Sequence, residues 1–70
     1  MRTIMEWDSA QQLHVIRDAE THDKIASFGD IGRCYVLYWA KPWSYQHIPK
    51  GAGYDKTLAE IRRSIARSGQ

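Results

Sequence analysis

A chain of 70 residues with a formal net charge of +2 and 43% hydrophobic residues has the composition of one small folded domain, which we expect to span residues 1–70. It has no apolar run long enough to cross a membrane, no charged-then-apolar leader, and a single cysteine that cannot form an internal disulfide. These features predict a soluble cytoplasmic protein without membrane contact.

The charges are unevenly distributed along the chain. Residues 1–31 hold three basic and six acidic side chains, a net charge of −3, whereas residues 32–70 hold seven basic and two acidic ones, a net charge of +5. A small dipolar domain of this kind can orient itself toward a charged partner.

The first half of the chain is predicted to form strands. Residues 3–7 are short and apolar enough for a first strand. Asp8 and Gln11 have the spacing of a capping box, which would start a helix at residue 9. The competing interpretation, a turn followed by a strand over 12–17, is favoured because Val15 and Ile16 are adjacent β-branched residues. A polar turn over 18–23 and an apolar stretch over 24–28 then complete a hairpin.

The apolar stretch over 34–40 is predicted to be the central strand. Alternation places Tyr35, Leu37 and Trp39 on one face, and the residues between them on the other. Neither face is polar, so the strand needs cover on both sides. Pro42 cannot donate to a ladder and should end the strand, after which residues 43–48 can add a short edge strand.

A helix is predicted after the glycine-containing loop over 49–53. Thr57 and Glu60 fit a capping box, and the helix should continue to about residue 68, where Gly69 can end it. Its apolar residues share one face, as a helix lying on a sheet requires: Leu58, Ile61 and Ile65. The predicted fold class is therefore α+β, with an antiparallel sheet of three to four strands (a β-meander) packed against one C-terminal helix.

Catalytic and metal-binding patterns are not evident. The histidines at positions 14, 22 and 47 have no Cys or carboxylate at ligand spacing. The Gly51–Gly53 segment lacks the third glycine and the Lys-Ser/Thr pair of a phosphate-binding loop, and no nucleophile has the context of a triad. We therefore expect no enzyme activity, no metal and no cofactor.

Two groups of side chains are candidates for binding a partner. A single helix covers one face of a sheet, so aromatic residues on the other face can remain exposed and mark an interface. The candidate partner-binding residues are Tyr38, Trp43, Tyr45, Arg33 and Lys41. The alternative is a nucleic-acid site built from Lys50, Arg62, Arg63 and Arg67. The plainer interpretations are that the small core or a homodimer covers the aromatic residues, and that the basic residues form a solvated helix face.

The order of elements carries a resemblance to known proteins. A hairpin, a strand introduced by Gly32 and Arg33, a glycine loop and the helix opened by Thr57-Leu58-Ala59-Glu60 resemble small accessory proteins of phages and mobile elements over residues 11–68. The layout is similar to the arm-type DNA-binding domains of tyrosine integrases, and the size is similar to compact phage inhibitors, including anti-CRISPR proteins. The first resemblance implies DNA binding through the sheet; the second implies docking on a host protein.

The acidic first half decides between these two implications. Four carboxylates at positions 6, 18, 20 and 23 belong to the early strands and their turn, where they would repel a phosphate backbone. We therefore expect a non-enzymatic inhibitor or regulator that docks on a host protein or nucleoprotein complex, with a minimal nucleic-acid-binding domain as the alternative.

Overall fold

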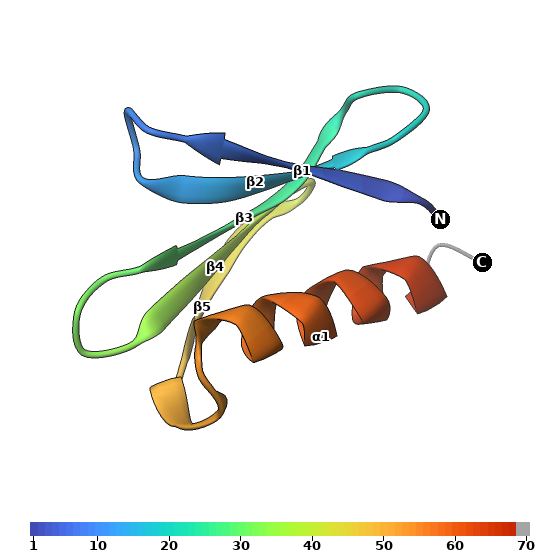
Figure 1. The fold of residues 1–70 in the computed structure, drawn as a ribbon. Helices are drawn as coiled ribbons and strands as arrows, with labels where there is room; N and C mark the ends of the chain where they lie inside the picture. The colour runs from blue at the N-terminus through green and yellow to red at the C-terminus, as the bar shows by residue number, and fades with distance from the viewer. Residues whose placement is uncertain (69–70) are drawn as a thin grey trace.

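The computed structural model describes residues 1–68 as a strand meander followed by one helix. Within these residues the elements are β1 (Thr3–Asp8), β2 (Leu13–Asp18), β3 (Lys24–Asp30), β4 (Tyr35–Ala40), β5 (Trp43–Ile48), the 3-10 turn η1 (Lys50–Ala52) and α1 (Tyr54–Ser68). The strands form one antiparallel sheet in the order β1-β2-β3-β4-β5 (Figure 1). The α+β meander with a C-terminal helix is thus confirmed.

The sheet has five strands, so the predicted number of three to four was too low. The additional strand is β5, which has the bounds 43–48 allowed for a short edge strand and pairs with β4 along its whole length, from Ala40 opposite Trp43 to Tyr35 opposite Ile48. Directly opposed side chains such as Tyr38 and Tyr45 stabilise this pairing through cross-strand contact.

Residues 9–12 form a turn, and β2 follows it, as the favoured interpretation predicted. The Asp8 carboxylate does accept hydrogen bonds from backbone N–H groups, those of Ala10 at 3.0 Å and Gln11 at 3.3 Å. The chain then turns at Gln12, whose φ of 57° is left-handed and incompatible with continuing a helix. Asp8 therefore closes a hairpin turn instead of capping a helix.

One face of the sheet forms the main core with α1 (Figure 1). From β4 this face presents Tyr35, Leu37 and Trp39, as predicted, and Phe28 of β3 is completely buried beside them. The helix contributes its predicted apolar face, in which all three residues are buried: Leu58, Ile61 and Ile65. The period of 3.6 residues in the sequence was thus sufficient to orient the helix.

The helix begins at Tyr54, so the prediction of Thr57 as its N-cap was wrong. Gly53 adopts a φ of 89°, which only glycine takes readily, and the helix starts immediately after it. Thr57 lies inside the first turn, is buried, and donates its hydroxyl to the Gly53 carbonyl at 2.7 Å. Gly69, the expected end of the helix, lies outside the described residues.

The second face of the sheet has a smaller apolar layer of its own. Val15 and Val36 are buried there although α1 covers the opposite face. Leu13 folds over Gly29, where an added Cβ would overlap its side chain. The glycine near the end of β3 therefore allows close packing.

Candidate functional site

Four aromatic rings form a continuous cluster on the sheet face away from α1. We call the residues Tyr38, Trp43, Tyr45 and His47 the aromatic patch. Neighbouring rings lie 5.6 Å apart for Trp43 and Tyr45, 5.7 Å for Tyr45 and His47, and 6.4 Å for Tyr38 and Trp43. The β4–β5 register produces this cluster because it places Tyr38 opposite Tyr45, with the other two rings two residues to either side along β5.

Most of the patch is open to solvent. Trp43 is 68% exposed and Tyr45 is 55% exposed, the two largest values among the exposed large hydrophobic side chains. Neither the core nor the helix covers them, so the interpretation that the core consumes the aromatic residues does not hold for these two. Such a cluster is an exposed apolar patch of the kind that marks an interaction surface.

The predicted partner-binding residues are only partly brought together. Tyr38, Trp43 and Tyr45 are in ring contact, and Lys41 lies in the turn directly before Trp43. Arg33 is exposed in the loop before β4, at the opposite end of that strand from Lys41. His47, which joins the patch, was missed because its ring contact depends on the register between β4 and β5.

A cavity of about 260 Å³ lies beside the patch, and sequence reasoning did not find it. Its walls come from the β1–β2 turn and from β2, β3, β4 and β5: Gln11, Leu13, Lys24, Ser27, Tyr38 and Trp43. Ser27 is 1% exposed, and its Oγ has no hydrogen-bond partner among the described residues. A buried, unpaired hydroxyl is unfavourable in the free protein.

Replacing Ser27 with Ala should therefore stabilise the free protein. The alanine removes a hydroxyl that gains no hydrogen bond and keeps the small volume of the site, so we expect the free energy of unfolding to rise by about 1 kcal/mol. Urea melts of the two proteins measure this difference. A loss of stability instead would mean that Ser27 Oγ has a partner in solution.

The four basic residues of the nucleic-acid alternative do not form one surface. Lys50 Nζ lies 2.9 Å from Asp30 Oδ1 and over the ring of Tyr35. The Arg62 guanidinium donates to Thr3 Oγ1 at 3.3 Å and to the Thr3 carbonyl at 3.2 Å. Arg63 and Arg67 are exposed, but they belong to α1, on the other side of the sheet from the aromatic patch.

The ion pair between Lys50 and Asp30 also lowers the pKa of the Asp30 carboxyl group. Hydrogen bonds from the Lys50 ammonium and the Gly32 N–H, the latter at 2.8 Å, hold the pKa of Asp30 below its ordinary value. The pair joins the end of β3 to η1 and so holds the segment that leads into α1 against the sheet.

A second cluster of rings fixes the start of α1 on the sheet. Tyr54 Oη donates to the Phe28 carbonyl at 3.2 Å and lies 2.6 Å from His14 Nδ1, which then acts as the donor to the phenol oxygen. Trp7 packs on His14 with ring centroids 4.8 Å apart. Burial raises the pKa of Tyr54, and the nearby charges of Asp30 and Asp55 raise it further. The cluster is a structural tie between β1, β2, β3 and α1.

The raised pKa of Tyr54 predicts a loss of stability in alkali. The folded protein holds this proton more tightly than the unfolded chain, so the contribution is complete below the ordinary tyrosine pKa of 10.0 and disappears as the pH rises through the raised value. We expect Tyr54→Phe to be less stable than the unmodified protein at neutral pH, with the gap closing above pH 10.0. Urea melts over this pH range test it; a constant gap would contradict the assignment.

The described residues contain no group of side chains placed to hold a metal ion and no helix that could cross a membrane. No three His, Cys, Asp or Glu side chains within residues 1–68 are grouped so that they could hold a metal ion. In the same part of the chain, the one helix is too short and too polar to cross a membrane.

Comparison with known proteins gives no relative from which a function could be transferred. No family model, no curated protein and no solved structure matches the chain. The candidate site therefore rests on its geometry alone.

Proposed function

We propose that this chain is a non-enzymatic binding protein that docks on another protein through the aromatic patch. The observation that carries the proposal is the exposure of Trp43 and Tyr45 in a contiguous ring cluster on an edge strand. Trp, Tyr and Arg dominate the binding energy of protein interfaces, and the rings of Trp and Tyr bury much area at little entropic cost because they are large and rigid.

The sheet face that carries the patch is mixed in charge, which favours a protein partner. Lys24 lines the cavity beside Trp43 and Lys41 precedes Trp43 by two positions, whereas Glu6 lies at the opposite edge of the same face, on β1, paired with Arg17 at 3.6 Å. A partner with both polar and apolar groups suits such a face. Within the class suggested by the resemblance, the protein would be a phage-type inhibitor or regulator that acts in the cytoplasm by covering a functional surface of a host protein or nucleoprotein complex.

A nucleic-acid-binding role remains the second candidate for a specific reason. Aromatic rings bordered by Lys24 and Lys41 can stack on unpaired bases while the ammonium groups contact phosphates. This version uses different cations from those expected from the sequence, since Lys50 and Arg62 are engaged within the chain.

A quantitative pull-down from host lysate, with and without nuclease, tests the proposal. We expect a protein partner that survives nuclease, is lost with Trp43→Ala and Tyr45→Ala, and is retained with Trp7→Ala. Trp7 is a matched control because it is 54% exposed but lies on β1, packed on His14, outside the patch. Recovery of nucleic acid alone would favour the second candidate. Equal capture by all three variants would exclude the patch as the docking surface.

A further inference from the structure

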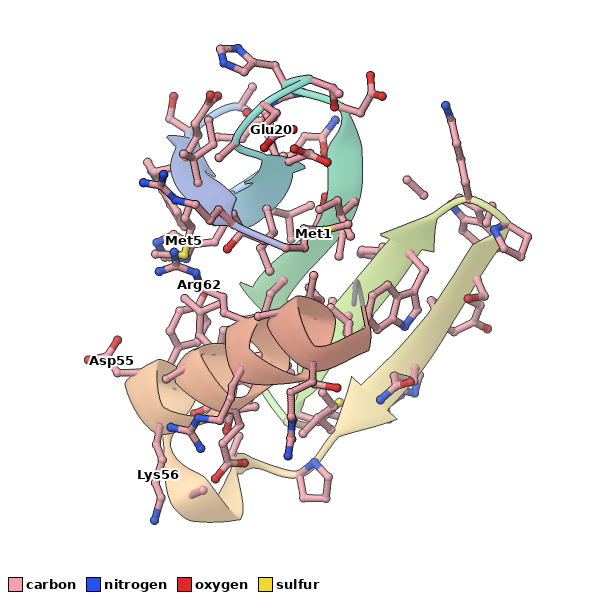
Figure 2. All side chains as sticks on the ribbon, turned by 90° about the vertical axis from the view of Figure 1, so that its right-hand side faces the viewer. Met1, Met5, Glu20, Asp55, Lys56 and Arg62 are labelled. Atoms are coloured by element: carbon pink, nitrogen blue, oxygen red, sulfur yellow. The ribbon has the colours of Figure 1, made fainter. Side chains whose placement is uncertain are left out.

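The two edges of the sheet differ in how well they are protected. At the start of β1, Arg62 hydrogen-bonds to the Thr3 carbonyl, and the amino terminus donates to the Ala66 carbonyl of α1 at 3.3 Å. Figure 2 shows Arg62 and Met1 beside this end of β1. On the other edge, β5 pairs only with β4, and no described side chain bonds to its backbone. The outer backbone groups of β5 are therefore free to pair.

The sequence of β5 also lacks the usual protection of an edge strand. Proteins block free edges with charged side chains, proline, bulges or covering segments. The strand Trp43–Ile48 contains no Lys, Arg, Asp, Glu or Pro, and five of its six residues are exposed. An edge of this kind is suited to receive another strand.

A groove of about 450 Å³ lies beside this edge, between β5 and α1. In Figure 1 the helix and β5 diverge from the turn that joins them. The apolar lining comes from Leu37, Trp39, Ile48 and Ile61; the polar lining includes Gln46, Glu60 and Ser64. Glu60 forms no ion pair with any described residue, so its carboxylate on the groove rim can accept a basic side chain from a partner.

We propose that the partner supplies an extended peptide segment that adds to β5 as a sixth strand. The inference rests on the proposed docking function and specifies its geometry. Because side chains of a strand alternate, every second residue of the segment would face the groove and the others would lie next to the aromatic patch. The groove selects an apolar side chain such as Leu or Ile, with a neighbouring Lys or Arg for Glu60.

A second copy of this chain is a poorer occupant of the same edge. If two β5 strands paired, the side chains of the partner strand on the helix side would be Ser44 and Gln46, with Ile48 at one end. The two polar residues do not match the apolar floor formed by Leu37 and Trp39. A peptide with a different sequence can place an apolar side chain on Leu37 and Trp39 and a basic side chain beside Glu60.

A displayed library of random linear peptides, selected on the full chain, tests this inference. We expect enriched peptides to show apolar residues at every second position with a basic residue nearby. In a synthetic peptide from the selection, N-methylation should weaken binding about tenfold or more at alternate positions and little at the positions between, because only alternate N–H groups face β5. Peptide binding that is insensitive to N-methylation at every position, or the absence of any enriched peptide, would overturn the proposal.

Variants on the helix separate this inference from the docking proposal. Ser64→Phe should fill the groove and weaken peptide binding about tenfold or more, whereas Ala59→Phe, on an exposed part of the helix outside the groove, should not. A protein partner that requires Trp43 but tolerates Ser64→Phe would overturn strand addition and leave docking intact. If sedimentation shows a dimer and Gln46→Pro dissociates it, a second copy of the chain occupies the β5 edge. That result would also overturn the peptide proposal.

Discussion

Replacing Phe28 with Ala is expected to lower the free energy of unfolding by about 3–5 kcal/mol. Phe28 is completely buried, and its ring contacts Tyr54 and Tyr35 with centroids 4.8 Å and 5.4 Å apart. A domain of this size has a total stability of roughly 4–10 kcal/mol, so the variant should be close to unfolding at room temperature. Urea titration followed by circular dichroism measures the change.

Two further variants make this result specific to the core. Phe28→Leu keeps most of the buried volume and should cost clearly less than Phe28→Ala. Tyr45→Ala removes an aromatic ring from the same sheet, but one that is 55% exposed, so its effect on folding should be within about 1 kcal/mol. If Phe28→Ala were as stable as Tyr45→Ala, the ring would not be at the centre of the core.

The parts of the fold that followed from the sequence are those set by local periodicity. Alternation alone placed Leu37 and Tyr38 on opposite faces of β4, and the helical period placed Ile61 and Ile65 toward the sheet. Two adjacent β-branched residues in β2 outweighed the capping-box spacing of Asp8 and Gln11. In each case the deciding interaction is between near neighbours in the chain.

The parts that did not follow depend on contacts between distant residues. The helix starts at Tyr54 because this side chain reaches His14 and the Phe28 carbonyl, a tertiary contact that overrides the capping box at Thr57. The sequence allowed an edge strand over 43–48, but its membership in the sheet as a fifth strand depends on pairing with β4. The unpaired hydroxyl of Ser27 becomes apparent only once four other elements pack around this part of β3.

The candidate site shows the same division. Sequence proximity grouped Tyr38, Trp43 and Tyr45, and the hairpin brought them into contact. It also grouped Arg33 with them, although a whole strand separates that residue from Lys41. A list of nearby basic residues does not distinguish a free cation from one engaged within the fold, as Arg62 is.

Trp43→Ala is expected to reduce affinity for the docking partner by about 2 kcal/mol or more, the range of an interface hot spot. The loss should be in binding alone, because Trp43 is 68% exposed and contributes little to the folded core. Calorimetry or fluorescence titration against the isolated partner gives the affinity, and a urea melt of the variant confirms that folding is unchanged.

The salt dependence of the same titration discriminates between the two classes of partner. For a protein partner anchored by aromatic rings, the affinity of the unmodified chain should change little with salt, and Arg63→Ala, on the exposed side of α1, should bind normally. For a nucleic acid, each neutralised phosphate releases counterions, so affinity should fall steeply with salt, and loss of one contacting cation such as Lys24 or Lys41 should reduce the slope by about one. We expect the weak salt dependence of a protein partner. The aromatic patch contains four rings, whereas the cations beside it are Lys24 and Lys41. Steep salt dependence together with normal binding by Trp43→Ala would reject docking through the aromatic patch.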